Sequence, residues 1–325
     1  LAQFTLRGLG SSSFNEGLES SVGFFVDGVY LGRQSMSITD LIDIERIEVA
    51  RGPQGTLFGK NATAGTIHVI TQKPQFTPET LLEVSAGSFN TLNVRGTTTG
   101  PLSDTLAVRL TGWHNERDGL LENRRNGEFY NDRQREGLRG QLLWTPTSRL
   151  STRVIAELSR VDELCCGFPL KGEPSKSIKA SDEYVLYQRP SGNPFDRIGD
   201  YDVRPSSKVE QYAVSSETQW DFSLRHRLVS LSAYRHFQFQ PLSDDNTSLD
   251  LVQGGTSTTS EQFSQELRID SRWRKAESVF GLYYLNQTTQ GAEYGLLGKD
   301  LTQWVFGGLI RQQLPFANRN NTGLL

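Results

Sequence analysis

The sequence contains no run of roughly 18 apolar residues, the length that a transmembrane helix needs. This absence excludes a helical membrane protein. It does not exclude a transmembrane β-barrel, because barrel strands alternate lipid-facing and lumen-facing residues and are polar on average. An excess of basic residues is missing too, since 34 lysines and arginines stand against 37 aspartates and glutamates. The formal net charge of -3 argues against a nucleic-acid partner.

Residues that carry covalent or metal chemistry are scarce. The four histidines lie far apart without the spacing of metal ligands, and no nucleophile, base and orienting acid can be assembled around them. We therefore expect neither an enzyme nor a resident cofactor. The only two cysteines are adjacent, Cys165 and Cys166. Because vicinal disulfides are uncommon, we favour an incidental pair, and the alternative is a staple within a loop in an oxidising compartment.

The N-terminus lacks an export signal and an initiator. The single methionine is Met36, and the chain starts Leu1-Ala2-Gln3-Phe4 with neither a charged n-region nor an apolar h-region. We expect that the natural protein has residues before Leu1, and we draw no conclusion from the missing signal.

Two regions differ in their residue pattern. Residues 1–74 are rich in glycine and short apolar runs, whereas from about residue 80 onward segments of roughly ten residues alternate apolar and polar side chains. In one such segment Leu106, Val108 and Leu110 fall on one side, and Arg109 and Thr111 fall on the other. We therefore expect two domains, 1–74 and 75–325.

Alternation by itself fits a soluble β-sandwich as well as a membrane barrel. The connections favour the barrel. Short links near residues 101–104, 145–148 and 274–277 alternate with long polar stretches. Short turns on one side and long loops on the other are typical of outer-membrane barrels. The predicted long loops are about 118–135, 162–207, 240–260 and 290–325, and the short link at 88–90 departs from this rhythm.

The first region holds three blocks in a fixed order. Residues 6–10 read Leu-Arg-Gly-Leu-Gly, residues 22–33 contain Val-Asp-Gly-Val, and residues 44–71 read as a strand, a glycine-rich turn and a second strand. The glycine-rich turn is not a phosphate-binding loop. Its glycines Gly55 and Gly59 are one residue too close for a Walker A motif, and no serine or threonine follows Lys60.

Together the three blocks resemble the plug of TonB-dependent receptors, whose sequences run IRG, then a VDGV-type strand, then an ERIEVxRGPQGTLFG segment that ends in an IxxIT strand. The match covers nearly all of residues 4–74. Departures are mild: Leu6 replaces the usual isoleucine, Ala50 a common leucine and Ala64 the usual glycine.

The resemblance implies a mostly β fold, in which a plug with a small mixed sheet fills a transmembrane antiparallel β-barrel. Barrels of this family have about 22 strands, of which about nine or ten are expected in this chain. The resemblance also implies ionic contacts between plug arginines and barrel glutamates. Arg7 and Arg51 match the plug arginines, and Glu266, on the polar side of its strand, is the candidate partner. A solvated lumen glutamate is the alternative for Glu266.

The resemblance also places two plug loops on the outer, ligand-facing side. Arg33 in the second loop suits an anionic ferric chelate through bidentate hydrogen bonds, although a solvated surface arginine fits as well. The candidate ligand-binding residues are Ser13, Phe14, Asn15, Glu16, Arg33 and Gln34.

The implied function is an outer-membrane receptor of a Gram-negative bacterium that imports a ferric siderophore, with energy from the TonB-ExbB-ExbD complex. Iron would arrive as a chelate, so no cofactor is expected. Other nutrients of the family (cobalamin, haem, saccharides, aromatics) stay open, as does a docking or signalling receptor without transport. A soluble secreted β-protein or enzyme is the third class, and it would need a polar exterior.

Overall fold

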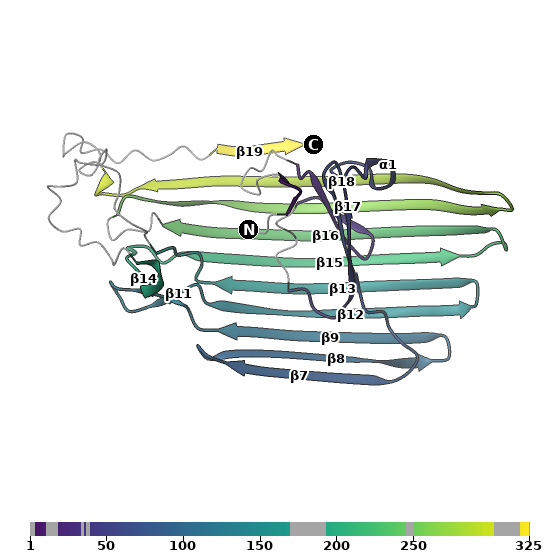
Figure 1. Cartoon of the computed structure of the whole chain (residues 1–325), viewed down its shortest axis with the longest axis horizontal. Coiled ribbons are helices and arrows are strands. Elements are labelled where there is room, and N and C mark those ends of the chain that lie inside the picture. The colour runs from purple at the N-terminus through teal and green to yellow at the C-terminus, as the bar shows by residue number, and fades with distance from the viewer. Residues whose placement is uncertain are drawn as a thin grey trace.

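The computed structural model describes residues 4–10, 19–33, 36, 40–169, 193–244, 250–301 and 319–324. Their regular structure is almost entirely β, with one sheet of ten strands, one of four and two smaller sheets. Figure 1 shows the four-stranded sheet lying across the long strands of the ten-stranded sheet. No helix in the described ranges has both the length and the apolar character needed to cross a membrane.

The ten-stranded sheet, called the wall below, is antiparallel throughout and confirms the expected number of strands. Its strands follow chain order, so each hairpin pairs with the next. They are β7 (Glu79–Gly87), β8 (Thr91–Ser103), β9 (Leu106–Arg117), β12 (Arg133–Thr147), β13 (Leu150–Glu163), β15 (Ser206–Trp220), β16 (His226–Asp244), β17 (Val252–Trp273), β18 (Ala276–Leu297) and β19 (Arg319–Leu324).

The two ends of the wall carry different connections, as the sequence predicts. Four tight turns, at residues 104–105, 148–149, 221–225 and 274–275, lie at one end. The longer connections lie at the other end, which is on the left in Figure 1. There β10 (Leu121–Asn123), β11 (Phe129–Tyr130) and β14 (Ile198–Gly199) form a small sheet, and η3 (Pro194–Asp196) precedes β14.

The wall strands are longer than expected, and here the sequence-based boundaries were wrong. Residues 240–260 were expected to be a loop, yet β16 continues to Asp244 and β17 begins at Val252, with Ser243 paired to Gly254. Strands β17 and β18 have 22 residues each. At about 3.3 Å per residue they are roughly 70 Å long, well beyond the apolar band of about 25 Å that a bilayer covers.

The two faces of the wall have opposite character. Its polar face is covered, and Arg153, Gln211 and Gln262 on that face are all buried. Its other face is apolar and exposed, with Leu158 57% and Val214 51% accessible. A soluble sandwich would bury the apolar face instead, so this arrangement favours a wall whose outer surface meets lipid.

The four-stranded sheet forms the body of the plug. Its strands are β3 (Val22–Val26), β4 (Val29–Leu31), β5 (Ile44–Arg51) and β6 (Gly65–Thr71), in the order β4-β3-β6-β5. The β3/β6 pair is parallel and the other two pairs are antiparallel, so the sheet is mixed, as expected. The glycine-rich turn between β5 and β6 contains the four-residue helix α1 (Gly55–Phe58), and the short β1 (Thr5–Leu6) and β2 (Leu9–Gly10) pair with each other.

A two-residue turn at Asp27-Gly28 closes the β3–β4 hairpin. Both residues have positive φ angles, 48° and 81°. Asp-Gly is a favoured pair for such a type I′ turn, because aspartate tolerates and glycine readily adopts the left-handed conformation. The turn thereby places Asp27 at the tip of the hairpin.

Among the described residues, apolar contact between plug and wall gathers in one cluster. Phe24, Leu31, Met36 and Val69 of the plug pack against Val161, Val209, Phe237 and Phe239 of the wall. Each fully buried side chain of this size contributes about 1.5–3 kcal/mol. Other covered wall residues, among them Arg109, Arg153 and Gln262, are polar, so the plug is also held by hydrogen bonds and ion pairs.

A charge on the outer face of the wall tests its contact with lipid. Val214 lies opposite Tyr234 and Ala156, which also point outward. We expect Val214→Arg to destabilise the protein in lipid vesicles, with a free energy of unfolding lower by about 2–4 kcal/mol for a site near the bilayer midplane. Val214→Leu is the matched control and should fold like the parent, as measured by heat-modifiable mobility after urea titration. Equal stability of the arginine and leucine variants would contradict a lipid-facing surface.

Candidate functional site between the plug and the wall

Asp43 is the most completely paired plug residue at the interface. It precedes β5, and its carboxylate accepts hydrogen bonds from Nε and Nη2 of Arg109 at 2.6 and 2.5 Å and from Oγ1 of Thr111 at 2.8 Å. Both members of the ion pair are more than nine-tenths buried. Burial raises the pKa of Asp43, but the hydrogen bonds from Arg109 and Thr111 outweigh it and hold the pKa below its ordinary value.

Asp27 connects the tip of the β3–β4 hairpin to the wall. Its Oδ1 lies 3.1 Å from Nη1 of Arg153, and it also accepts the backbone N–H of Thr71 at 3.0 Å. Arg153 continues the contact by donating to Oγ1 of Thr71 and to Oε1 of Gln141, both at 2.7 Å. One guanidinium thus joins two plug strands to two wall strands.

Asp40 forms the third contact between a plug carboxylate and a wall arginine. Its Oδ1 lies 3.3 Å from Nη1 of Arg135, and its Oδ2 accepts a hydrogen bond from the side-chain amide of Asn115. Arg135 is also paired with Glu163, at 2.5 Å from Nε to Oε1. Arg135 is therefore shared between Asp40 of the plug and Glu163 at the C-terminal end of β13.

Two further arginines lie in the wall behind the plug. Arg139 binds Glu157 with Nε–Oε2 of 2.7 Å and donates to the carbonyl oxygen of Ile42 at 2.8 Å. Arg235 lies near the same glutamate, but within the described part of the chain its one hydrogen bond is a long contact of 3.5 Å to Gln211. Its Nε is buried without a hydrogen-bond partner.

A neutral clamp holds the edge of the plug sheet. Gln262 donates to the carbonyl oxygen of Tyr30 at 2.6 Å and accepts the N–H of Gly32 at 2.9 Å, as a neighbouring strand would. A Cβ at Gly32 would lie 2.2 Å from Oε1 of Gln287, so that side chain would have to shift if Gly32 were replaced.

The charged residues of these contacts balance. We call the following set the interface network: five wall arginines, two wall glutamates and three plug aspartates, namely Arg109, Arg135, Arg139, Arg153, Arg235, Glu157, Glu163, Asp27, Asp40 and Asp43. The wall members alone carry an excess of three positive charges, and the plug members supply three negative ones. Buried charges need such partners because an unpaired one is strongly destabilising.

The expected partners Arg7, Arg51 and Glu266 are not brought together. In the described parts of the chain Arg7 and Arg51 are exposed and form no ion pair. Glu266 does face the lumen side, in line with Ser264 and Gln262, but its Oε1 pairs with Nη1 of Arg268 on its own strand at 2.8 Å. The pairing found has the reverse polarity, with carboxylates on the plug and arginines on the wall, because the wall's lumen face is rich in arginine.

The candidate ligand residues lie mostly outside the described residues. Ser13, Phe14, Asn15, Glu16 and Gln34 belong to this group. Arg33 follows β4 and is half-buried, and burial lowers the pKa of its guanidinium. Its role in ligand binding stays a prediction.

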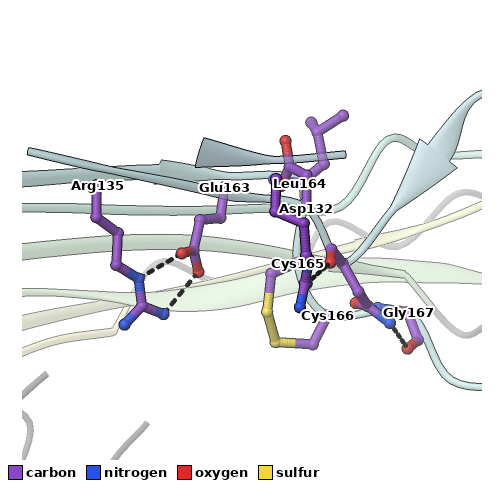
Figure 2. Close-up of a disulfide and its surroundings, with 9 residues drawn as sticks. Asp132, Arg135, Glu163, Leu164, Cys165, Cys166 and Gly167 are labelled. Carbon is purple, nitrogen blue, oxygen red and sulfur yellow. Dashed lines mark hydrogen bonds and ion pairs between the residues drawn. A yellow bond between two sulfur atoms is a disulfide. The ribbon is translucent and has the colours of Figure 1, made fainter. Parts of the chain in front are cut away.

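The outer ends of β12 and β13 are tied together around the two cysteines (Figure 2). Cys165 and Cys166 are bonded to each other, so the loop staple that the sequence left as the alternative is the arrangement found. Next to them Asn131 donates to and accepts from the backbone of Gly167, at 2.8 and 2.9 Å. Asp132 accepts the N–H of Leu164 at 2.6 Å, and burial raises the pKa of Asp132.

A model of the TonB-dependent Receptor Plug Domain family matches residues 1–66. Residues 1–66 thus match the plug domain of the TonB-dependent receptors. The matched region ends inside β6, the plug strand that holds Thr71, and the chain continues from there into the wall.

Similar proteins are receptors as well. The pesticin receptor of Yersinia pestis is 36% identical over 102 residues, which are 31% of this chain and 15% of the relative. The ferrioxamine receptor of Yersinia enterocolitica is 29% identical over 140 residues, which are 42% of this chain and 19% of the relative. The chain thus aligns with less than a fifth of either relative.

The fold is similar to that of the ferric yersiniabactin uptake receptor FyuA from Yersinia pestis. The TM-score is 0.70 at 21% identity, over 86% of this chain and 41% of the solved one. The likeness shows the shared architecture of plug and barrel wall, and the chain spans less than half of that receptor.

Loss of one carboxylate should loosen the plug. Asp43→Ala leaves Arg109 buried without its charge partner, so we expect plug seating to weaken by about 3–5 kcal/mol. The measurement is hydrogen exchange of β5 and β6 in the natural protein. Glu45→Ala is the matched control, because Glu45 is an exposed plug carboxylate whose pair with Arg46 contributes about 0–1 kcal/mol. Equal exchange in both variants would contradict the assignment.

The same ion pair predicts a pH dependence. The pKa of Asp43 is lower in the folded protein than its ordinary value of 3.8, so its contribution is complete above that value and is lost as pH falls through the folded pKa. We expect plug exchange, corrected for intrinsic rates, to stay constant from about pH 7 to pH 5 and to rise below about pH 4. In Asp43→Asn this acid step should shrink. An unchanged step would assign it to other carboxylates.

Proposed function

We propose that this chain forms the plug and part of the barrel of an outer-membrane receptor for TonB-energised import of a ferric siderophore. The observation that carries the proposal is the covered polar face of the wall, on which a plug domain is seated by ion pairs while the apolar face stays exposed. A protein with this arrangement can stand in lipid and keep a removable stopper in its lumen.

The names of similar proteins support iron as the cargo. One relative is a ferrioxamine receptor, and the similar solved structure is a ferric yersiniabactin uptake receptor. In the proposed receptor iron arrives as a chelate and leaves as one, so the chain needs no cofactor and performs no covalent chemistry.

The composition of the interface suits a plug that moves. A polar interface can exchange its hydrogen bonds with water at small net cost, whereas a large apolar one would lose its full burial energy. The apolar cluster is one patch, and the remaining contacts are hydrogen bonds and ion pairs. Force from the TonB-ExbB-ExbD complex on the N-terminal part of the plug would replace these contacts by water and open a path beside the wall.

The location follows from the same two faces. In a Gram-negative outer membrane the exposed apolar surface of the wall would contact lipid, with the tight turns on the periplasmic side and the long connections outside. The disulfide at Cys165-Cys166 lies at the end with long connections, where an oxidising environment is expected.

Uptake in cells tests the function. A strain that lacks the natural gene is supplied with it on a plasmid and given ferrioxamine, ferric yersiniabactin or labelled cobalamin as separate probes. We expect growth or uptake with at least one ferric chelate, and its loss when TonB is deleted. Binding without uptake in every case would indicate a docking receptor. Uptake of cobalamin alone would show that the cargo is cobalamin and not a ferric siderophore. Uptake that persists without TonB would overturn the proposal.

A further inference from the structure

Several lumen-facing side chains form one continuous row around the wall at the level of the plug. Neighbouring strands are paired so that each residue of the row lies directly opposite the next: Thr111, Arg139, Glu157, Ala213, Arg235 and Gln262. A ligand that travels through the lumen beside this wall must pass the row. The charges of the row therefore bear on which ligands can pass.

The positive charge of the row is only partly neutralised from within the wall. Glu157 binds Arg139 closely, and Arg235, 8% exposed, has no carboxylate within ion-pair distance among the described residues. Ala213 stands between Glu157 and Arg235 in the row and leaves a small cavity there, which is also lined by Asp27. The cavity has room for about one water molecule, so no chelate fits while the plug is in place.

The plug aspartates neutralise three further wall arginines. Asp43, Asp27 and Asp40 pair with Arg109, Arg153 and Arg135, which lie beside the row on strands β9, β13 and β12. Three carboxylates leave this wall when the plug leaves it. The wall members of the interface network then hold five arginines against two glutamates.

We propose that displacement of the plug turns this wall into a positively charged lane, which makes the receptor select ligands with net negative charge. The proposal rests on the proposed function, because it requires the plug to move. In the closed receptor the plug aspartates pair with the wall arginines. When the plug is displaced, the aspartates leave with it and the arginines become accessible. The substrate class is an anionic chelate whose carboxylate, catecholate or phosphate-like oxygens can accept bidentate hydrogen bonds from guanidinium groups.

The strength of such a lane follows from its surroundings. A narrow passage with low-dielectric walls focuses the field of its charges, and this raises local concentrations and entry rates of opposite charges by roughly 10- to 1,000-fold. The preference should fall with salt, because the screening length is about 8 Å at physiological ionic strength.

A cysteine in the row reports the charge of the open lane. In the natural protein, Ala213→Cys places a thiol between Glu157 and Arg235, and the two native cysteines are bonded to each other. Cells are treated with a negatively charged sulfonatoethyl or a positively charged trimethylammonioethyl methanethiosulfonate. With TonB energised, we expect the negative reagent to react roughly tenfold faster, and less so at high salt.

A variant whose lane carries less positive charge provides the comparison. Arg109→Gln and Arg153→Gln are combined with Asp43→Asn and Asp27→Asn, so that the plug meets amides instead of unpaired charges and the wall loses two positive charges. The rate ratio of the two reagents should fall to within about threefold of unity. The control combines Arg268→Gln with Glu266→Gln, which removes an ion pair within β17 without changing the net charge of the wall. Its ratio should match that of Ala213→Cys alone.

Each outcome decides the proposal. Equal rates, or faster reaction of the positive reagent, would overturn it, and so would absence of labelling, because the passage would then not open along this wall. Ser215→Cys is a second position that lines the same cavity and differs from the natural residue by one atom, so it serves if Ala213→Cys does not fold. Labelling that is independent of TonB would sink the proposed function, whereas the ratio of the two rates would still report the charge of the wall.

Discussion

The structure depends on the need of a buried guanidinium for a carboxylate. Arg109 and Arg153 project from the wall toward the plug and are buried there, and each forms an ion pair with a plug aspartate. Such a pair contributes little net stability when complete, because desolvation offsets attraction, but breaking it costs several kcal/mol. These ion pairs therefore determine the position of the plug but contribute little to the strength of its binding. A plug that closes the lumen and is later displaced requires both a defined position on the wall and a small apolar contact with it.

Backbone geometry places these partners correctly. The antiparallel register aligns Arg139, Glu157 and Arg235 across four hairpin-connected strands. On the plug side, the Asp-Gly turn holds one carboxylate at the tip of a short hairpin, where it can reach Arg153. The edge strand β4 is covered by the amide of Gln262, so its backbone groups are satisfied by a side chain of the wall. Neutral and charged contacts thus together orient the four-stranded plug sheet against the wall.

Much of this architecture is readable from the residues. Alternation placed Arg109 and Thr111 on the polar face, and the glycine-rich blocks predicted the strand-turn-strand unit of β5 and β6. The partners were not predictable in the same way. Family resemblance directed attention to Arg7, Arg51 and Glu266, yet the ion pairs between plug and wall join residues 66 to 126 positions apart, and no local pattern encodes such a distance. The available signal was indirect: repeated arginines on a lumen face require carboxylates from elsewhere, and Asp27 and Asp43 flank plug strands.

The length of β17 and β18 has a consequence for locating the membrane. A tilted strand needs about 9–11 residues to cross the apolar band, which is about half of a 22-residue strand. The outer part of β17 is rich in serine, threonine and glycine, which accounts for its loop-like appearance in the sequence. Strand ends in this protein therefore do not mark the bilayer surface. The paired strands instead continue past the apolar band, so that backbone hydrogen bonds between neighbouring strands, and not lipid, hold this part of the wall together.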